Sequence, residues 1–369
     1  MLSKTYKQFS VMAMTFLALL AMASCSDDKG EVAAPDVVDE EEGYTAGLEK
    51  PSAMTVMTYE NVPVIDGSDG TLPLRQLLIA KELGVEVEWG NEMSETFPRA
   101  WFAPKGDASG WNRLILNTIK MSRYTHTAFV ECINGTTELI ITDRGITQEE
   151  QELAQEKGVE LLSRPVAKDA LTFIVHADNP VQNLTLEQIR KIYTGEITNW
   201  KEVGGNDALI IPYVRNADSG TQTNMETMVM KGLSMPDREH NSGLLGYYND
   251  ANLYRMVDVH QYDVICYAPY YYYRYIVKNE EVKEWNEMSA RGDILPSTKI
   301  KALSLEGVSP SRETIASGEY PVVTDVIASV RSDIDRSSVA YRLFYQMATG
   351  KKDQVIDESG YVTVSHPQK

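Results

Sequence analysis

The chain has 369 residues, of which 43% are hydrophobic, and its formal net charge is −18 at pH 7. This length makes two domains the default expectation, and the apolar content suffices for two ordinary cores. The acidic balance argues against a nucleic-acid-binding protein, because such proteins bind phosphate backbones through an excess of Lys and Arg.

Residues 1–25 have the pattern of a secretory signal peptide. Two lysines precede an apolar stretch from Val11 to Ala23, and Cys25 follows two residues later. About a dozen apolar residues are too few to span a bilayer. The residues before Cys25 are lipobox-like, so we expect lipidation of Cys25, with an ordinary signal peptide as the alternative. The acidic residues 26–57 are predicted to form a disordered tether.

Two segments further along predict helices that begin near hydroxyl residues. An apolar run from Val62 to Ile65 leads into the Gly-rich turn 66–73, after which leucines recur at helical spacing: Leu74, Leu77 and Leu78. A second helix is predicted to start at Thr125 and to stop at Gly135, with an apolar face made of Phe129, Cys132 and Ile133.

Asp143 follows the apolar strand predicted over residues 138–142 and precedes the turn Arg144-Gly145. Ligands of open α/β sheets bind at the carboxyl ends of the strands. Asp143 is therefore a candidate ligand-binding residue. The alternative is a structural role, in which Asp143 caps the turn that follows the strand.

The loop 215–221 places an arginine, two hydroxyl residues and a glycine directly before a helix. That helix is predicted from an apolar face of Met225, Met228 and Val229, and Gly232 can end it. Unpaired N–H groups at a helix start and a planar Arg fork both favour an oxyanion. The loop therefore predicts a small-oxyanion site, with a Ser-capped helix beside a surface Arg as the alternative.

Much of the remaining chain alternates between strands and helices. Capping boxes at Thr147 and Thr185 begin helices that stop at Gly158 and Gly195. Strands are predicted over residues 159–162, 171–175, 262–267 and 322–330. This alternation predicts α/β layers.

Several residues with reactive or aromatic side chains are expected to be structural. Cys132 and Cys266 lie in apolar segments and are predicted to be buried thiols and not a disulfide. The tyrosine run 270–273 is predicted to pack in the core, with two rings buried and two exposed by strand alternation. The five histidines are scattered singly, without the spacing of a metal site, and His126 is expected to cap a helix in its neutral form.

In these motifs the chain resembles the phosphate-binding proteins of bacterial ABC transporters, the PstS family of type II periplasmic binding proteins. The resemblance extends over residues 60–364 and is most specific in the stretches 184–205, 215–221, 313–321 and 358–362. It implies an α/β fold of two lobes with a ligand cleft between them. Lobe 1 would comprise residues 58–163 plus 324–369, and lobe 2 residues 164–323.

The resemblance also implies which residues bind the ligand. The family's motifs match Thr71, Leu72, Thr125, Asp143, Arg215, Ser219, Gly220 and Thr221. Asp143 matches the carboxylate that accepts the proton of the bound phosphate. The chain departs from the family's Ser-Ser-Gly-Gly pattern at Thr125-His126-Thr127-Ala128, where hydroxyl donation survives but the backbone approach is bulkier.

The family's function would make this chain a lipid-anchored extracytoplasmic protein, in the periplasm or on the cell surface, that captures inorganic phosphate for an ABC permease. We expect a monomer without cofactor or metal, which contacts the membrane through its anchor only. A phosphatase would need a nucleophile with an adjacent base or a metal cluster, and the loops show neither. The alternative is a surface lipoprotein or sensor of the same fold that binds another small oxyanion.

Overall fold

The computed structural model of the protein describes residues 47–94, 97–105, 114–115, 118–119, 124–215, 217–235, 263–274 and 300–364. The predicted signal peptide, its lipidation site Cys25 and the predicted tether up to residue 46 lie outside these ranges. Within the described ranges, no helix combines the length and hydropathy that a bilayer span requires.

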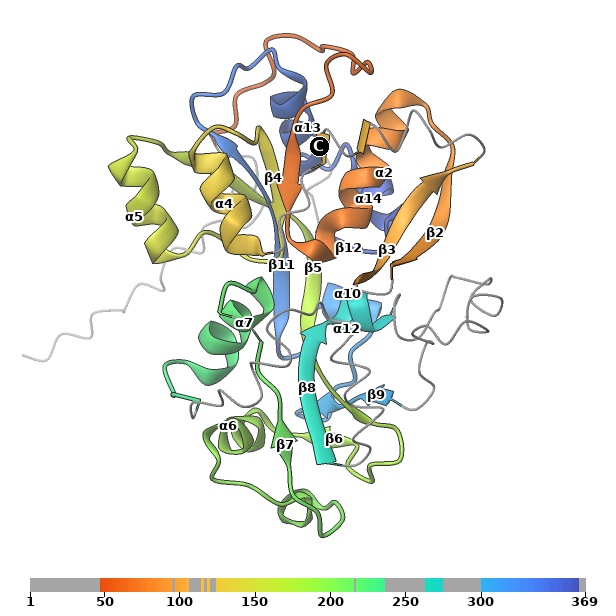
Figure 1. Cartoon of the computed structure of the whole chain (residues 1–369), viewed down its shortest axis with the longest axis vertical. Helices are drawn as coiled ribbons and strands as arrows, with labels where there is room; N and C mark the ends of the chain where they lie inside the picture. The colour runs from red at the N-terminus through yellow and green to blue at the C-terminus, as the bar shows by residue number, and fades with distance from the viewer. Residues whose placement is uncertain are drawn as a thin grey trace, which may run out of the picture. The chain divides into compact units, whose positions relative to one another are not determined.

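A mixed sheet of eight strands is the centre of the described structure (Figure 1). Its order is β1 (Ile65–Gly67), β4 (Leu139–Thr142), β11 (Val323–Arg331), β5 (Leu161–His176), β8 (Val264–Pro269) and β7 (Ile211–Pro212). The strands β9 (Ile300–Ala302) and β12 (Val362–Thr363) also pair with β5. β1 runs parallel to β4 and β7 parallel to β8, whereas β11 is antiparallel to both β4 and β5.

β5 replaces the two separate strands predicted over residues 159–162 and 171–175. The polar stretch between them stays extended because it pairs with β11 along its length. Pro165 has no N–H to donate, and the register between the two strands shifts beside it, between Val326 and Ile327. β5 then changes partners after Ala170 and pairs with β8 and β9. One strand thus joins the two parts of the body, while the lobe boundaries given above stay a prediction.

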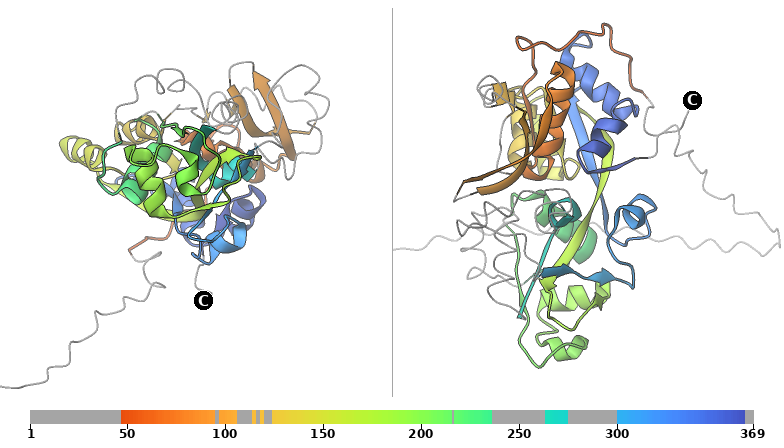
Figure 2. Two further views of the ribbon diagram at one scale, coloured as in Figure 1. Left: turned by 90° about the horizontal axis from the view of Figure 1, so that it is seen from below. Right: turned by 90° about the vertical axis from the view of Figure 1, so that its right-hand side faces the viewer.

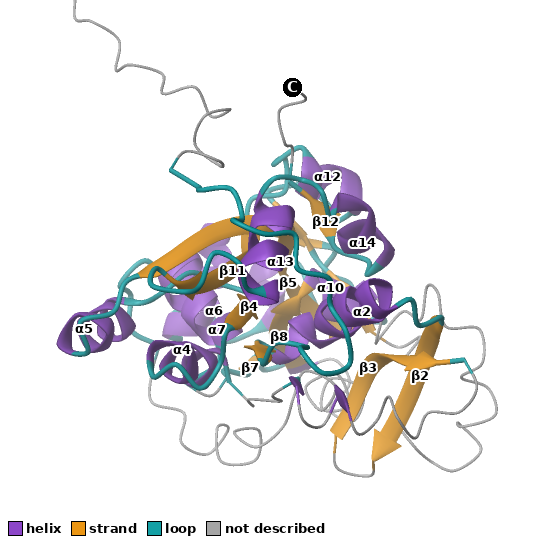
Figure 3. Ribbon diagram, turned by 90° about the horizontal axis from the view of Figure 1, so that it is seen from above, coloured by secondary structure: helices purple, strands orange, loops and turns teal. Residues whose placement is uncertain are grey.

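Helices cover both faces of the sheet. The first part of the sheet consists of β1, β4, β11, β12 and β5 up to Ala170, and the second part consists of the rest of β5 with β7, β8 and β9. The first part carries α2 (Leu72–Leu83), α4 (Thr125–Ile133), α5 (Gln148–Glu156), α13 (Val339–Ala348) and α14 (Asp353–Glu358). The second part carries α6 (Leu186–Thr194), α7 (Gly220–Asn224) and α12 (Arg312–Ala316). The short α10 (Tyr270–Tyr272) follows β8, but its Tyr271 and Tyr272 pack in the core of the first part. α4 and α13 lie on opposite sides of the sheet (Figures 2 and 3). All four residues of β4 between them are buried, as in an interior strand.

Smaller elements lie around the sheet and its helices. The hairpin of β2 (Val87–Ser94) and β3 (Phe97–Pro104) lies beside α2 (Figure 3). β6 (Asn183–Leu184) and β10 (Ser304–Leu305) form a short parallel pair, and η2 (Trp200–Val203) is a 3₁₀ helix. Two large apolar cores form, one under α2 and α13 and the other under α6, in line with the composition. A smaller third cluster lies between α4 and β4 and contains Phe129, Cys132 and Ile140.

The predicted helix ends are confirmed where capping decides them. Thr147 and Thr185 each accept the N–H of the residue three positions on, and both capping boxes are complete. Gly195 follows α6 in the left-handed region at φ 84°. The predicted α4 also starts at Thr125, and its apolar face is fully buried.

The helix after the loop 215–221 differs from its prediction. α7 continues as the π-helix η3 (Met225–Met230). A π-turn spaces its hydrogen bonds five residues apart, so the buried face shifts along the chain. Met225 and Val229 are buried as expected, but Met230 and not Met228 is the third fully buried member.

The tyrosine run is helical at α10 and not a strand. Tyr271 and Tyr272 are buried in the core, which confirms the packing role but makes the buried pair adjacent and not alternating. Cys132 and Cys266 are confirmed as buried free thiols. The last part of the predicted tether is packed on the body, because Glu49 and Thr55 hydrogen-bond to the start of α13 and the turn before it.

Candidate functional site

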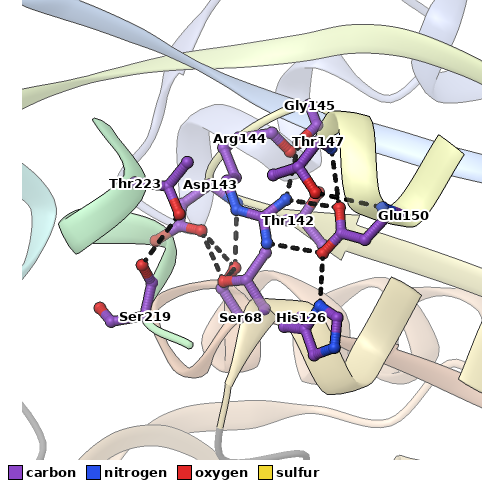
Figure 4. A network of polar contacts seen from close by, with 11 residues as sticks. Ser68, His126, Thr142, Asp143, Arg144, Gly145, Thr147, Glu150, Ser219 and Thr223 are labelled. Atoms are coloured by element: carbon purple, nitrogen blue, oxygen red, sulfur yellow. Dashed lines mark hydrogen bonds and ion pairs between the residues drawn. The ribbon is translucent and has the colours of Figure 1, made fainter. Parts of the chain in front are cut away.

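A cluster of two hydroxyls and one carboxylate forms where β1 and β4 end. The two strands are parallel, with Gly67 paired to Ile141, so Ser68 and Asp143 emerge at the same edge of the sheet. The Ser68 hydroxyl donates to Oδ1 of Asp143 at 2.5 Å, and Thr125 at the start of α4 donates to the same oxygen at 2.9 Å. The main-chain N–H of Asp143 in turn donates to Ser68 Oγ at 3.0 Å (Figure 4).

The turn that carries Ser68 is tightly specified. A Cβ atom at Gly67 would lie 1.8 Å from the carbonyl oxygen of Ile141, so only glycine allows β1 to approach β4 this closely. η1 (Asp69–Thr71) follows, and the Thr71 hydroxyl donates to the carbonyl oxygens of Ile141 at 2.6 Å and Ser68 at 2.9 Å. The turn is therefore fixed to the sheet independently of any ligand.

Thr71 and Leu72 direct their main-chain donors into the same turn. The N–H of Thr71 donates to the Ser68 carbonyl oxygen at 3.0 Å, and the N–H of Leu72 donates to that of Asp69. In this arrangement the main-chain N–H groups of both residues are paired within the turn that carries Ser68. The fully buried Arg75 reinforces the turn, since its guanidinium donates to the Ser68 carbonyl oxygen at 3.0 Å.

The start of α7 lies directly against the carboxylate cluster. A Cβ atom at Gly220 would lie 2.1 Å from Asp143 Oδ1 and 2.6 Å from Thr125 Oγ1. Asn224, one turn further along, donates to the Asp143 carbonyl oxygen at 3.0 Å. The residues on either side of Gly220, Ser219 and Thr221, are both buried. Three distant segments therefore meet at Asp143.

Two features of the loop 215–221 bear on the alternative of a plain Ser-capped helix. Ser219 occupies the N-cap position of α7, but its side chain makes no capping hydrogen bond. Arg215 is half-buried, and its main-chain N–H donates to Oε1 of Gln222 at 2.9 Å and to the hydroxyl of Tyr267 at 3.3 Å. Tyr267 also donates its hydroxyl hydrogen to Gln222. The loop is thus held by buried polar contacts and is not a loosely capped surface segment.

Arg144, the residue after Asp143, forms a buried ion pair with Glu150. Arg144 donates from both guanidinium ends to Glu150, at 2.8 Å to Oε2 and 2.7 Å to Oε1, and both side chains are buried. Glu150 is also part of the capping box of α5, in which its side chain accepts the main-chain N–H of the N-cap residue Thr147 at 2.8 Å. Burial acts to raise the pKa of Glu150, but the hydrogen bonds and charge of Arg144 outweigh it and hold this pKa below its ordinary value.

His126 belongs to this network and does not cap its own helix. Its Nδ1 lies 3.1 Å from Oε1 of Glu150, and the N-cap of α4 is Tyr124 (Figure 4). The expected capping role of His126 is therefore wrong. Its ring contacts the buried carboxylate of Glu150 instead of the start of α4. The network ties the first turn of α4, which holds Thr125, to the loop that holds Asp143.

Ser68 and Asn224 are the site residues that the sequence did not single out. Ser68 is the first hydroxyl after the end of β1, just as Asp143 is the first acid after the end of β4. Asp143 was predicted because ligands bind at the carboxyl ends of strands. The same rule would have predicted Ser68 if the parallel pairing of β1 with β4 had been known. Asn224 carries no comparable signal in the sequence.

Comparisons with known proteins place the chain in a family. A model of the PBP superfamily domain matches residues 126–335, more than half of the chain, so the chain belongs to this superfamily. The phosphate-binding protein PstS of Staphylococcus haemolyticus is 25% identical over 248 residues, which cover 66% of this chain and 71% of that protein. The PstS of Borreliella burgdorferi is 24% identical over 238 residues, 62% of this chain and 72% of the relative.

Solved structures give the same fold at low identity. A protein from Clostridium perfringens, described as a phosphate ABC transporter substrate-binding protein with bound phosphate, aligns with a TM-score of 0.55 and 21% identity. The alignment covers 83% of this chain and all of that one, 100%. An ABC-type phosphate transport receptor from Vibrio cholerae aligns at 0.53 with 22% identity over 82% of this chain and 99% of its own. The predicted α/β fold of type II periplasmic binding proteins is therefore confirmed.

Proposed function

We propose that the chain is an extracytoplasmic binding protein that captures inorganic phosphate and delivers it to an ABC permease. The observation that carries this proposal is the Asp143 carboxylate, which lies among the hydroxyls of Ser68 and Thr125 with Gly220 against it. An acceptor surrounded by donors suits an oxyanion that still carries a proton. The relatives named above, which are phosphate-binding proteins, support the same ligand.

Donors from both parts of the sheet would surround the phosphate. Ser68 and Thr125 would turn their hydroxyls from Asp143 to the ligand, while Ser219, Gly220 and Thr221 would donate from the start of α7. Arg215 would supply the full positive charge, in a charge-assisted and bidentate pair. Thr71 and Leu72, which match the family's first ligand turn, would act by fixing Ser68.

The acidic surface does not oppose this function. Removing the predicted signal peptide takes away two lysines and no acids, so the net charge becomes 33 − 53 = −20. The Debye length is about 8 Å at physiological ionic strength, so distant surface carboxylates are screened while donors that touch the ligand are not. The long-range charge should slow the capture of phosphate more than it weakens its binding.

Asp143 would provide the discrimination between phosphate and sulfate. At neutral pH hydrogen phosphate carries a proton that a carboxylate can accept in a hydrogen bond, whereas sulfate carries none. A site built around such a polar partner rejects the analogue that lacks it by a factor of roughly 10⁴ to 10⁵. Sulfate would therefore meet an unpaired, repelling carboxylate in a partly buried position.

Asp143→Asn should reduce this discrimination more than it reduces phosphate affinity. Without ligand the amide oxygen can still accept from Ser68 and Thr125. Towards a bound anion the amide nitrogen adds a donor where the carboxylate could only accept. We expect competition titrations to show sulfate displacing phosphate from the variant at concentrations that leave the parent loaded. If the variant excludes sulfate as strongly as the parent does, Asp143 is only a structural residue at the end of β4.

We further propose that Cys25 carries a lipid anchor, which places the binding domain in the cell envelope. The support is the lipobox-like sequence at the end of the predicted signal peptide. Cys25→Ala should move the protein from the membrane fraction to the soluble fraction. The variant has no thiol to lipidate, whereas two acyl chains would hold the parent firmly in the membrane. Intact-mass measurement of the purified protein checks this directly. A mature N-terminus at another residue, without added lipid mass, would rule the anchor out.

A further inference from the structure

A second acid, Asp169, is buried in the strand that joins the two parts of the sheet. It lies in β5 one residue before Ala170, after which β5 exchanges β11 for β8 and β9. Asp169 is only 4% exposed. Its Oδ1 accepts the main-chain N–H of Ala170 at 2.8 Å and that of Tyr271 at 3.0 Å. No Lys or Arg in the described ranges forms an ion pair with it, so its negative charge lacks a cationic partner there.

Tyrosine side chains connect Asp169 to the turn that carries Ser68. The ring of Tyr271 stacks on that of Tyr361, with centroids 4.3 Å apart and planes 11° from parallel. Tyr361 then donates its hydroxyl hydrogen to the carbonyl oxygen of Gly70 at 2.9 Å, in the same turn as Ser68. A Cβ atom at Gly70 would lie 3.2 Å from the ring of Tyr272, so the tyrosines pack closely against the turn.

Asp143 is the charged group that acts on Asp169 from the facing elements. The titratable side chains that interact with Asp169 are Asp143 from the loop after β4 and Tyr361, and Tyr271 contacts it through its main-chain N–H. From β11 the paired residue is Thr324, which does not titrate. Lys168 and Asp325 are neighbours along the strands, but side-chain alternation places them on the other face of the sheet.

The surroundings of Asp169 favour its neutral form. Burial is the largest influence and raises the pKa of Asp169 to about 7, against two main-chain hydrogen bonds that lower it. The negative charge of Asp143 raises this pKa as well. Asp169 therefore titrates close to neutral pH and responds to charge at Asp143.

We propose that Asp169, which is linked through the tyrosines to the turn that carries Ser68, takes up a proton when an anion binds beside Asp143. A bound anion adds negative charge beside Asp143, which already raises the pKa of Asp169. The anion should therefore raise this pKa further and favour the neutral form of Asp169. The proton comes from the solvent and is bound by the Asp169 carboxylate; no covalent bond of the ligand changes. The proposal rests on the proposed function, because it requires an anion to bind at Asp143. It makes anion affinity fall as the pH rises through neutrality.

Calorimetry of phosphate binding tests this with Asp169→Asn. The amide keeps the oxygen that accepts from Ala170 and Tyr271 but cannot titrate. Titrations near a pH of about 7.5, in two buffers of different ionisation enthalpy, give the number of protons taken up per phosphate bound. The ionisation of phosphate itself is common to both proteins and cancels in the comparison. We expect the variant to take up fewer protons per phosphate bound than the parent does. As the pH rises, the phosphate affinity of the parent should fall further than that of the variant, by a factor of up to about ten for each unit by which phosphate raises the pKa of Asp169.

Measuring the stability of both proteins against pH, without phosphate, tests the pKa of Asp169 separately from phosphate binding. Because folding raises the pKa of Asp169 from its ordinary value of 3.8 to about 7, the folded chain holds a proton between these pH values that the unfolded chain has released. The parent should therefore lose stability relative to Asp169→Asn as the pH rises from about 4 to about 7. Phosphate binding with equal proton uptake in both proteins overturns the proposal for Asp169 alone. Absence of phosphate binding in both proteins overturns the proposed function and this proposal with it.

Discussion

Glu150→Gln should destabilise the protein by about 3 to 5 kcal/mol, because it leaves the buried guanidinium of Arg144 without a compensating charge. The substitution keeps the shape of the side chain and an oxygen that can accept from Thr147, so the loss reports the charge and not a cavity. Chemical denaturation at neutral pH measures the change in the free energy of unfolding.

The exposed pair Arg331 and Asp333 is a matched control for the buried pair. It is also bidentate, with Arg331 donating from Nε at 2.9 Å and from Nη2 at 2.6 Å, but the Asp333 side chain is 65% exposed. Asp333→Asn should therefore change stability by about 1 kcal/mol or less. The double variant Arg144→Met with Glu150→Gln should recover part of the loss, since no buried charge is then unpaired. Equal effects at the two pairs would contradict the role given to burial.

Acid should remove the same contribution in the parent protein. The pKa of Glu150 is lower in the folded chain than in the unfolded chain. The stabilisation by Glu150 is therefore complete above the ordinary Glu pKa and is lost as the pH falls through the lowered value. The parent should lose stability on acidification more steeply than Glu150→Gln does.

Arg215→Ala should weaken phosphate binding by about 2 kcal/mol or more, which is about 30-fold in the dissociation constant. The arginine is the only cation assigned to the ligand, and it is half-buried, so solvent cannot replace its charge fully. The fold should persist, because the contacts that hold the loop to Gln222 and Tyr267 come from the main chain of Arg215. Isothermal titration with phosphate measures the change.

A charge-removal control separates the local role of Arg215 from the net charge of the protein. Lys201 in the 3₁₀ helix η2 pairs with Asp207, and the Lys201 side chain is 57% exposed. Lys201→Ala should leave phosphate affinity unchanged within a few-fold at physiological ionic strength. If Arg215→Ala binds phosphate as tightly as Lys201→Ala does, the loop 215–221 is not the phosphate loop.

Local signals in the sequence predicted the elements that short-range chemistry determines. The capping boxes at Thr147 and Thr185, the strand before Asp143 and the helix that starts at Thr125 all appear in the structure. In each case the residue types specify the backbone within about four positions. The carboxylate cluster was half predicted for the same reason, since Asp143 and Thr125 each follow from their own segment.

Features that depend on long-range pairing could not be predicted in this way. Ser68 joins Asp143 only because β1 and β4 are parallel neighbours, and their register is set by strands far apart in the sequence. β5 remains one strand through Pro165 because β11 pairs with it and shifts register there. The burial of Asp169 depends on tyrosines that lie about a hundred and about two hundred residues later in the chain.

Isothermal titration of the chain without its predicted signal peptide, against phosphate and then sulfate, tests the central claim most directly. The proposed site predicts saturable binding of one phosphate per chain, which sulfate at the same concentration neither reproduces nor displaces, since the carboxylate of Asp143 rejects it by a factor of roughly 10⁴. Equal binding of phosphate and sulfate, or no saturable binding of phosphate at all, would contradict it.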